Sequence, residues 1–136
     1  MNQPLLLDTC AAIFLVGKQL NPSAREALQD AGRNLLAVYV SPITAWELGM
    51  LVSRGRLALN MSPEAWFTRL IHGGLQLAEL SPEIMIASSF LPGSNLRDPS
   101  DRIIVATARA HGYKLVTRDR PLLEYASQGH VNALAC

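Results

Sequence analysis

The chain has 136 residues, of which 49% are hydrophobic and 17% are charged, and its formal net charge at pH 7 is +1. This composition excludes a disordered chain, and the length fits one globular domain that buries about two-thirds of its unfolded surface. Because the chain carries no overall basic field, any nucleic-acid partner must be held by local positive charge.

Short apolar segments alternate with helical patterns along the chain. The strands are expected, in chain order, at 5–7, 37–40, 75–80 and 114–117, with 131–134 as an optional fifth. The helices are expected at 10–16, 22–31, 43–54, 63–72, 82–91 and 99–111. Strands separated by helices are typical of βαβ units. We therefore expect an α/β fold, as one domain over residues 1–136, with a mainly parallel four- to five-stranded sheet covered on both faces.

A recurring pair of residues marks the helix starts. Five pairs join a capping residue to proline: Asn21-Pro22, Ser41-Pro42, Ser62-Pro63, Ser81-Pro82 and Asp98-Pro99. Asn, Ser and Asp accept a backbone N–H at the N-cap, and proline is well suited to the next position. Gly73 and Gly112 are expected at helix C-termini. The segment PGSNLR at 92–97 is the expected mobile loop.

Carboxylates lie at the ends of two expected strands. Asp8 directly follows the first strand, and Asp119 comes two residues after the fourth. The carboxyl ends of parallel strands are where open α/β sheets bind ligands. Asp101 lies in the first turn of the helix that leads to the fourth strand. Each acid also has a local role available, because Asp8, Asp98 and Asp119 fit helix N-caps and Asp101 fits a capping box.

Glu47 is the acid that a local role explains least well. Its helical neighbours at i−4, i+3 and i+4 are Ile43, Met50 and Leu51, so Glu47 lies on an apolar stripe. A carboxylate in that position is costly unless something pairs with it. No lysine or arginine lies within one turn on that face, and a metal ion is a natural partner.

The residues that are absent indicate which metal would suit these acids. The three histidines are scattered and give no zinc-ligand spacing: His72, His111 and His130. Oxygen ligands alone suit Mg²⁺ or Mn²⁺. The two cysteines form no CxxC pair, which favours a reducing cytoplasm. No apolar run is long enough for a membrane span, so no membrane partner is expected.

Four segments carry a resemblance to a known family: LLLDT at 5–9, TAWELGML at 44–51, DPSDRIIVATA at 98–108 and LVTRD at 115–119. In this order and spacing they resemble the PIN-domain ribonucleases, above all the VapC-type toxins of bacterial toxin–antitoxin modules. The resemblance covers nearly the whole chain. It implies a three-layer α/β/α fold with an acidic pocket and Mg²⁺- or Mn²⁺-dependent endonucleolytic cleavage of RNA. It also implies a small antitoxin as a protein partner, and a homodimer.

The resemblance assigns roles to individual residues. The catalytic and metal-binding acids would be a quartet: Asp8, Glu47, Asp101 and Asp119. Asp98 is a further candidate ligand. Thr9 and Thr117 match positions that carry hydroxyls near the acids, although a local backbone hydrogen bond fits each of them equally well. We expect in-line attack on the RNA phosphodiester by metal-activated water.

RNA binding also requires positive side chains near these acids. The arginines that flank the acidic motifs are the main candidates: Arg97, Arg102, Arg118 and Arg120. Further candidates lie elsewhere, with the last two less favoured: Arg54, Arg56, Lys114 and His111. For each arginine, a salt bridge or a solvated position is the alternative. Trp46 and Trp66 fall on apolar helical patterns, so a core or interface position is expected for both.

Two other functions fit parts of the pattern. A catalytically inactive PIN-like module that binds a protein partner would share the fold, but the intact quartet argues against it. A phosphorylated receiver-like domain also places acids at strand ends. It needs paired acids after the first strand and a lysine after the last, whereas here Thr9 and Cys10 follow Asp8, and no lysine follows Asp119.

Overall fold

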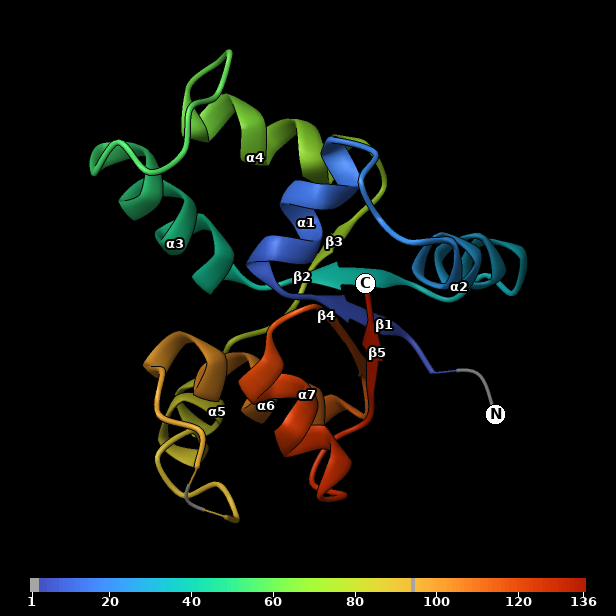
Figure 1. Cartoon of the computed structure of the whole chain (residues 1–136), viewed down its shortest axis with the longest axis vertical. Helices are drawn as coiled ribbons and strands as arrows, with labels where there is room; N and C mark the ends of the chain where they lie inside the picture. Colours follow the sequence, from blue (N-terminus) through green and yellow to red (C-terminus); the bar gives the residue numbers. More distant parts are fainter. Residues whose placement is uncertain (1–2, 94) are drawn as a thin grey trace.

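The computed structural model describes residues 3–93 and 95–136, and its fold is a three-layer α/β/α arrangement (Figure 1). The middle layer is a parallel sheet of order β3-β2-β1-β4-β5. Its strands are β1 Leu5–Leu7, β2 Val38–Val40, β3 Gln76–Leu77, β4 Lys114–Thr117 and β5 Ala133–Ala135. The helices are α1 Thr9–Val16, α2 Pro22–Arg33, α3 Pro42–Ser53, α4 Pro63–His72, α5 Pro82–Ala87, α6 Pro99–His111 and α7 Arg120–Ser127. The predicted α/β class and parallel sheet are confirmed.

The sheet is covered on both faces, with α1 to α4 on one side and α5 to α7 on the other (Figure 1). Leu5 and Leu7 of β1 pack in one core with Leu48 of α3 and Trp66 of α4. Leu6 packs in the other core, against α6 and α7. Successive strand residues point to opposite faces, so a sheet buried on both sides needs consecutive apolar residues. The three leucines of β1 meet that need.

The five capping pairs act as predicted. The side chain of each capping residue accepts a backbone N–H at the start of its helix: Asn21, Ser41, Ser62, Ser81 and Asp98. Gly112 ends α6 in the left-handed conformation, with φ 73°, as a C-terminal glycine should. Gly73 ends α4 with φ −74° instead, and the positive φ falls on Gly74.

Several element boundaries differ from the prediction. β3 has two residues where 75–80 was expected, because the chain leaves the sheet after Ala78 and Ser81 already caps α5. α5 ends at Ala87 and not at residue 91, since two serines follow and Pro92 disfavours helix before it. Asp119 caps α7, as its fit to an N-cap indicated, although no range was assigned to that helix among the expected elements. β5 lies two residues later than its predicted start.

Two other expectations concern side chains and a loop. A core or interface position was expected for both tryptophans, and Trp66 is buried in the core, whereas 54% of Trp46 is exposed, which excludes the core and leaves the interface for this residue. Hydrogen bonds from Arg102 and Tyr125 anchor the expected mobile loop at 92–97, at the carbonyls of Leu96 and Pro92. Ser94 of that loop lies outside the described residues.

Among the described helices, none is long and apolar enough to cross a membrane.

Gly112→Ala is expected to lower the free energy of unfolding by about 1–2 kcal/mol, because a Cβ is strained at a left-handed position. Gly49→Ala, inside α3, is the matched control. A Cβ at Gly49 meets nothing within 4 Å, so this change should raise the free energy of unfolding by roughly 0.5–1 kcal/mol. Urea unfolding of both variants measures the difference. Equal effects at the two glycines would contradict the assigned cap.

Candidate active site: an acidic cluster at the carboxyl ends of the strands

The predicted acids approach one edge of the sheet from several elements. Asp8 follows β1 and Asp119 follows β4, and these two strands are paired in parallel. Glu47 lies on α3, which begins directly after β2, while Asp98 and Asp101 lie at the start of α6. The chain runs outward from β1 to β2 and β3 on one side and from β4 to β5 on the other. The acids therefore lie where the strand order reverses, which is the usual ligand site of open α/β sheets.

Asp8 is the most enclosed member of the cluster, with only 4% of the residue exposed. Its Oδ1 accepts the Ala11 backbone N–H at 2.8 Å, which makes Asp8 the N-cap of α1. Its Oδ2 accepts a hydrogen bond from the Thr117 hydroxyl. Burial is the main cause that raises the pKa of Asp8, and both hydrogen bonds oppose the rise. Asp8 is thus a helix cap and a cluster member at once.

Glu47 is half-buried, and the hydroxyl of Thr9 holds one of its carboxylate oxygens. Thr9 Oγ1 donates to Glu47 Oε1 at 2.5 Å, and Thr9 Oγ1 also lies 3.1 Å from Thr44 Oγ1. Burial raises the pKa of Glu47 most, nearby carboxylates add to the rise, and hydrogen bonds from Thr9 and Ser100 lower it. Glu47 is thus partly buried, as its apolar stripe indicated, and it lies close enough to Asp8 for that carboxylate to raise its pKa. Its role as a metal ligand stays a prediction.

Asp98 and Asp101 have different local roles at the start of α6. Asp98 Oδ1 accepts the backbone N–H groups of Ser100 and Asp101 at 2.9 and 3.2 Å, so Asp98 is the N-cap. In the described chain, no hydrogen bond reaches the Asp101 carboxylate, so the reciprocal half of a capping box is not formed. Burial and then the charges of neighbouring acids, Asp98 first, raise the pKa of Asp101 to about 8.

Asp119 and Cys10 complete the surroundings of the cluster. Asp119 Oδ2 accepts the Leu122 backbone N–H at 3.3 Å as the N-cap of α7. Cys10 follows Thr9 in the first turn of α1. Cys10 is an exposed residue, but partial burial of its thiol, and then four surrounding carboxylates, raise the pKa of that thiol to about 11. The four acids that act on this one thiol are the predicted quartet: Asp8, Glu47, Asp119 and Asp101.

The donor set of the cluster is one of oxygens only, which matches Mg²⁺ and Mn²⁺. Across residues 3–93 and 95–136, however, no group of three or more His, Cys, Asp or Glu side chains is arranged to hold a metal ion. Mg²⁺ usually keeps several waters and is bound through one or two carboxylates. The cluster therefore fits a divalent ion with few direct protein ligands, and it does not fit a closed cage of protein ligands.

Two of the four main arginine candidates are engaged within the protein. Arg102 donates to the backbone carbonyls of Ser88 at 2.8 Å and Leu96 at 2.5 Å, so it fixes the segment before α6. The Arg118 guanidinium lies 3.6 Å from the centre of the Phe14 ring, a cation–π contact that ties α1 to the loop after β4. These contacts fix neighbouring segments in place, a role the sequence analysis missed.

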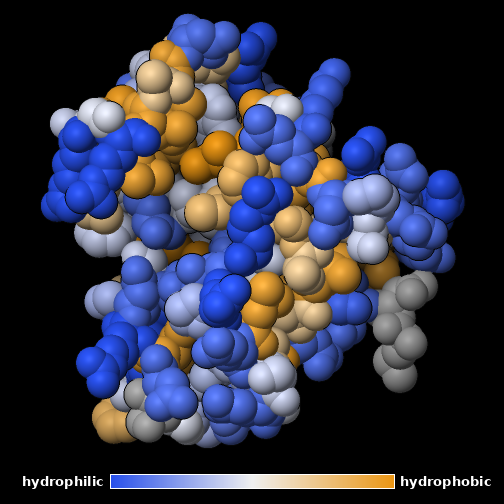
Figure 2. All heavy atoms as spheres, viewed as in Figure 1, coloured by the Kyte–Doolittle hydropathy of each residue, from blue (hydrophilic) through white to orange (hydrophobic). Residues whose placement is uncertain are grey.

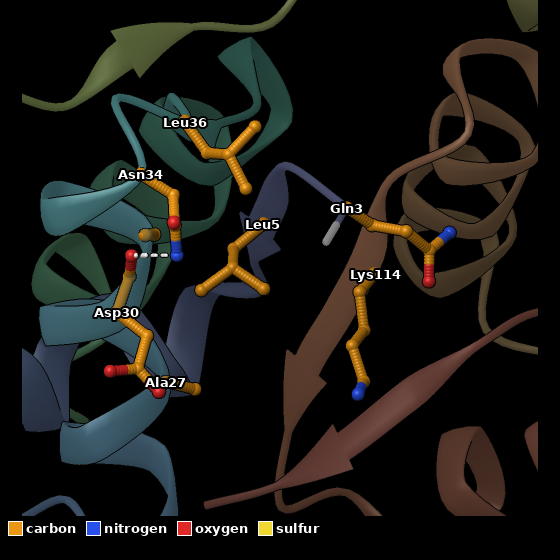
Figure 3. Close-up of a pocket in the computed structure, with 8 residues that line it drawn as sticks. Gln3, Leu5, Ala27, Asp30, Asn34, Leu36 and Lys114 are labelled. Carbon is orange, nitrogen blue, oxygen red and sulfur yellow. Dashed lines mark hydrogen bonds between the residues drawn. The ribbon is translucent and has the colours of Figure 1, made fainter. Parts of the chain in front are cut away.

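Arg97 and Arg120 are different, because both are exposed and neither makes a hydrogen bond or ion pair with another described residue. Lys114 lies at the other end of β4. It points toward a cavity of about 210 Å³ that Gln3 and Asp30 also line (Figure 3). Asp30 is the one acid among the residues that line this pocket, so the pocket holds no second acidic cluster. The Asp30 carboxylate also pairs with Arg33 at 2.6 Å.

The surface beside the cluster is mainly apolar. A cavity of about 440 Å³ lies between the N-terminal turns of α3 and α6, lined by Trp46, Pro99, Ser100 and Ile103 among others. Figure 2 shows a notch in the surface between the half that carries α3 and α4 and the half that carries α5 and α6. Exposed Trp46 is explained by this position, because it borders an open cavity and not the core.

Comparisons with known proteins agree with this geometry. The family model of the PIN domain matches residues 5–127. The chain is 31% identical over 120 residues to Ribonuclease VapC22 of Mycobacterium tuberculosis, which covers 87% of this chain and 88% of that protein. It is similar in fold to the crystal structure of VapBC2 from Rickettsia felis bound to a promoter DNA fragment, with TM-score 0.70, 18% identity and coverage of 97% and 98%. A toxin–antitoxin complex from Klebsiella pneumoniae matches with TM-score 0.55, 25% identity and coverage of 85% and 86%.

The metal-free protein is expected to lose stability as pH rises from about 4 to about 8. The pKa of Asp101 is about 8 in the fold against 3.8 in its ordinary state, so the folded state binds the proton more tightly. Its contribution is full below pH 4 and lost as pH rises through 8. Thermal melts in EDTA from pH 5 to 9 measure this slope.

Asp101→Asn should flatten the slope and raise the metal-free melting temperature at pH 8 by several degrees. Asp98→Asn is the control, because asparagine still caps the helix, and it should keep most of the slope. A wild-type melting temperature that is constant or rises over this pH range would contradict the assigned environment of Asp101.

Proposed function

Because this chain belongs to the PIN-domain family, we propose that it is a divalent-metal-dependent endoribonuclease and the toxin of a type II toxin–antitoxin pair. The observation that carries the proposal is the acidic quartet at one sheet edge: Asp8, Glu47, Asp101 and Asp119. Burial and mutual repulsion of these acids favour a cation, which relieves both. RNA as substrate is supported by the 31% identity to a protein named as a ribonuclease.

The four acids would hold the metal ion, Mg²⁺ or Mn²⁺, with one or two of them as direct ligands and the others through water. When bound, such an ion lowers the pKa of water and neutralises charge that develops on the phosphate. Asp8 and Glu47 are already oriented by threonine hydroxyls, so they lose little side-chain freedom on binding. Asp98 orders the α6 N-terminus and thereby places Asp101, whose proton must leave before the carboxylate can bind a cation.

RNA would be positioned by side chains that flank the cluster. Arg97 and Arg120 project into solvent on either side of the acidic motifs and are suited to phosphate contacts. Arg102 and Arg118 would act indirectly, because they fix the segments that carry these neighbours. Local charge of this kind accounts for RNA binding by a chain whose net charge is only +1.

A cytoplasmic antitoxin and a second copy of this chain are the proposed protein partners. The 25% identity to a chain of a toxin–antitoxin complex supports the antitoxin. Large apolar side chains are exposed on α3, on α5 and after α5, as Trp46, Ile86 and Phe90. A further apolar cavity of about 310 Å³ lies beside α1 and α4, lined in part by Leu15 and Trp66. Apolar surface of this extent is typical of chains that are covered by partners.

The purified protein is expected to cleave RNA with Mg²⁺ or Mn²⁺ and to lose all cleavage in EDTA. Glu47→Gln and Asp101→Asn should each lower the cleavage rate by about 100-fold or more, because a neutral amide is a poor ligand for a divalent ion. Asp98→Asn should lose far less, since asparagine caps as well. Rates on structured and single-stranded RNAs, with circular dichroism to check the fold, provide the test. Undiminished cleavage in EDTA would exclude the metal mechanism, and a fold that neither cleaves nor binds Mn²⁺ would favour the inactive binding module.

Arg97→Gln and Arg120→Gln are expected to raise KM for RNA several-fold, to leave kcat nearly unchanged and to weaken the salt dependence of KM. Both variants should melt like the wild type, because the two arginines make no described internal contact. Arg102→Gln is the contrasting variant. It should lower the melting temperature, because the carbonyls of Ser88 and Leu96 lose their donor. A salt-independent KM in the wild type would count against phosphate contacts at these positions.

A further inference from the structure

Two acids of the cluster each accept a hydrogen bond from a threonine hydroxyl, and the oxygen of each of these hydroxyls makes a second hydrogen bond to another group. Thr117 donates to Asp8 Oδ2, and its Oγ1 accepts the Asp119 backbone N–H at 3.0 Å. Thr9 donates to Glu47 Oε1 at 2.5 Å, and its Oγ1 lies 3.1 Å from Thr44 Oγ1. In the first chain of hydrogen bonds the direction is fixed, because a backbone N–H can only donate.

The direction of the second chain follows from counting protons. A threonine hydroxyl has one proton to donate and can accept through its lone pairs. The Thr9 proton is directed to Glu47 Oε1, which accepts it at 2.5 Å. The bond between the two threonines therefore requires Thr44 to donate to Thr9. Thr9 is the hydrogen-bond partner that the described residues offer the Thr44 hydroxyl, and Thr44 is 0% exposed, so bulk water does not replace it.

We propose that Thr44 is a positioning residue of the active site, which directs the Thr9 hydroxyl onto Glu47 and so fixes that carboxylate. Thr44 and Glu47 are three residues apart on α3 and share one face of the helix, while Thr9 belongs to α1. The chain from Thr44 through Thr9 to Glu47 thus returns to the helix on which it begins. It joins α1 to α3, and each hydrogen bond in such a chain strengthens the next. The effect on catalysis rests on the proposed function, whereas the orientation of Thr9 does not.

Three variants separate positioning from packing. Thr44→Val keeps the shape of the side chain and removes the hydroxyl, and Thr44→Ser restores a hydroxyl. Thr107→Val is the matched control, because Thr107 is also 0% exposed and donates to the Ile103 carbonyl at 2.8 Å, within α6. Any loss that comes only from removing a buried hydroxyl should appear in Thr107→Val as well.

The first measurement uses the metal-free protein and the hydroxyl-proton resonance of Thr9 in NMR spectra. In the wild type this proton should exchange slowly with solvent, because Thr9 is 6% exposed and bonded on both sides. Thr44→Val should accelerate the exchange by about tenfold or more, whereas Thr44→Ser and Thr107→Val should not. Unchanged exchange in Thr44→Val would overturn the proposal, whether or not the protein is a nuclease.

The second measurement is Mn²⁺ affinity together with kcat and KM for RNA. Thr9→Val should weaken Mn²⁺ binding by about 10-fold or more, and Thr44→Val by roughly 3- to 10-fold, with kcat lowered and KM for RNA unchanged. In a Thr9→Val background, Thr44→Val should have no further effect, because the hydrogen-bond chain from Thr44 through Thr9 to Glu47 is already broken. If the wild type is active but Thr44→Val has the same Mn²⁺ affinity and kcat as Thr107→Val, the inferred role of Thr44 is overturned. A different result is that the wild type neither binds Mn²⁺ nor cleaves RNA, while Thr44→Val still accelerates exchange of the Thr9 hydroxyl proton. That result would overturn the proposed nuclease function and leave the inferred hydrogen-bond chain in place.

Discussion

The burial of several carboxylates close to one another is the constraint on which this site depends. Burial raises the pKa of Asp8, Glu47 and Asp101, and the nearby acids add to the rise in each case. Folding therefore works against ionisation of the cluster, and a proton or a cation must compensate for it. A structural role alone does not require such a cost, since one capping aspartate for each helix would be enough. The crowding of the acids is what distinguishes this edge of the sheet from the opposite one, where Asp30 pairs with Arg33.

Helix capping and clustering are two uses of the same side chains. Asp8, Asp98 and Asp119 each begin a helix and each accept backbone N–H groups, in every case through one carboxylate oxygen. The second oxygen remains for other contacts, such as the Thr117 hydroxyl at Asp8. Helix N-termini also carry partial positive charge, which offsets part of the repulsion among the acids. A fold that begins a helix directly after each of these positions thus places and partly stabilises the cluster at once.

Local chemistry was readable from the sequence, and contacts between distant segments were not. The cap–proline pairs and the partly buried position of Glu47 depend on neighbours within one helical turn, and the apolar strands β1 and β4 depend on short runs of consecutive residues, and the structure has all of these where the sequence indicated. Trp46 shows the limit, because an apolar helical pattern does not reveal whether a partner helix covers that face. Arg102 and Arg118 show it as well, since their carbonyl and aromatic partners lie on other elements. Thr44 stands three residues before Glu47, but its role depends on Thr9, 35 positions away in the chain.

The acids of the cluster have no ion-pair partner among the described arginines and lysines, so nothing in the described chain neutralises their charge directly. Among the described residues the ion pair found is Arg33 with Asp30, remote from the cluster. Arg118 lowers the pKa of Asp8 through its charge, yet its guanidinium lies over Phe14 and not against a carboxylate. An arginine bound directly to these acids would neutralise them and compete with any cation for the same oxygens. The fold instead supplies hydroxyls and backbone N–H groups, which orient carboxylates without cancelling their charge. Residues that keep acids oriented and still charged are what a site for a divalent cation requires, and a site evolved only for stability would pair them.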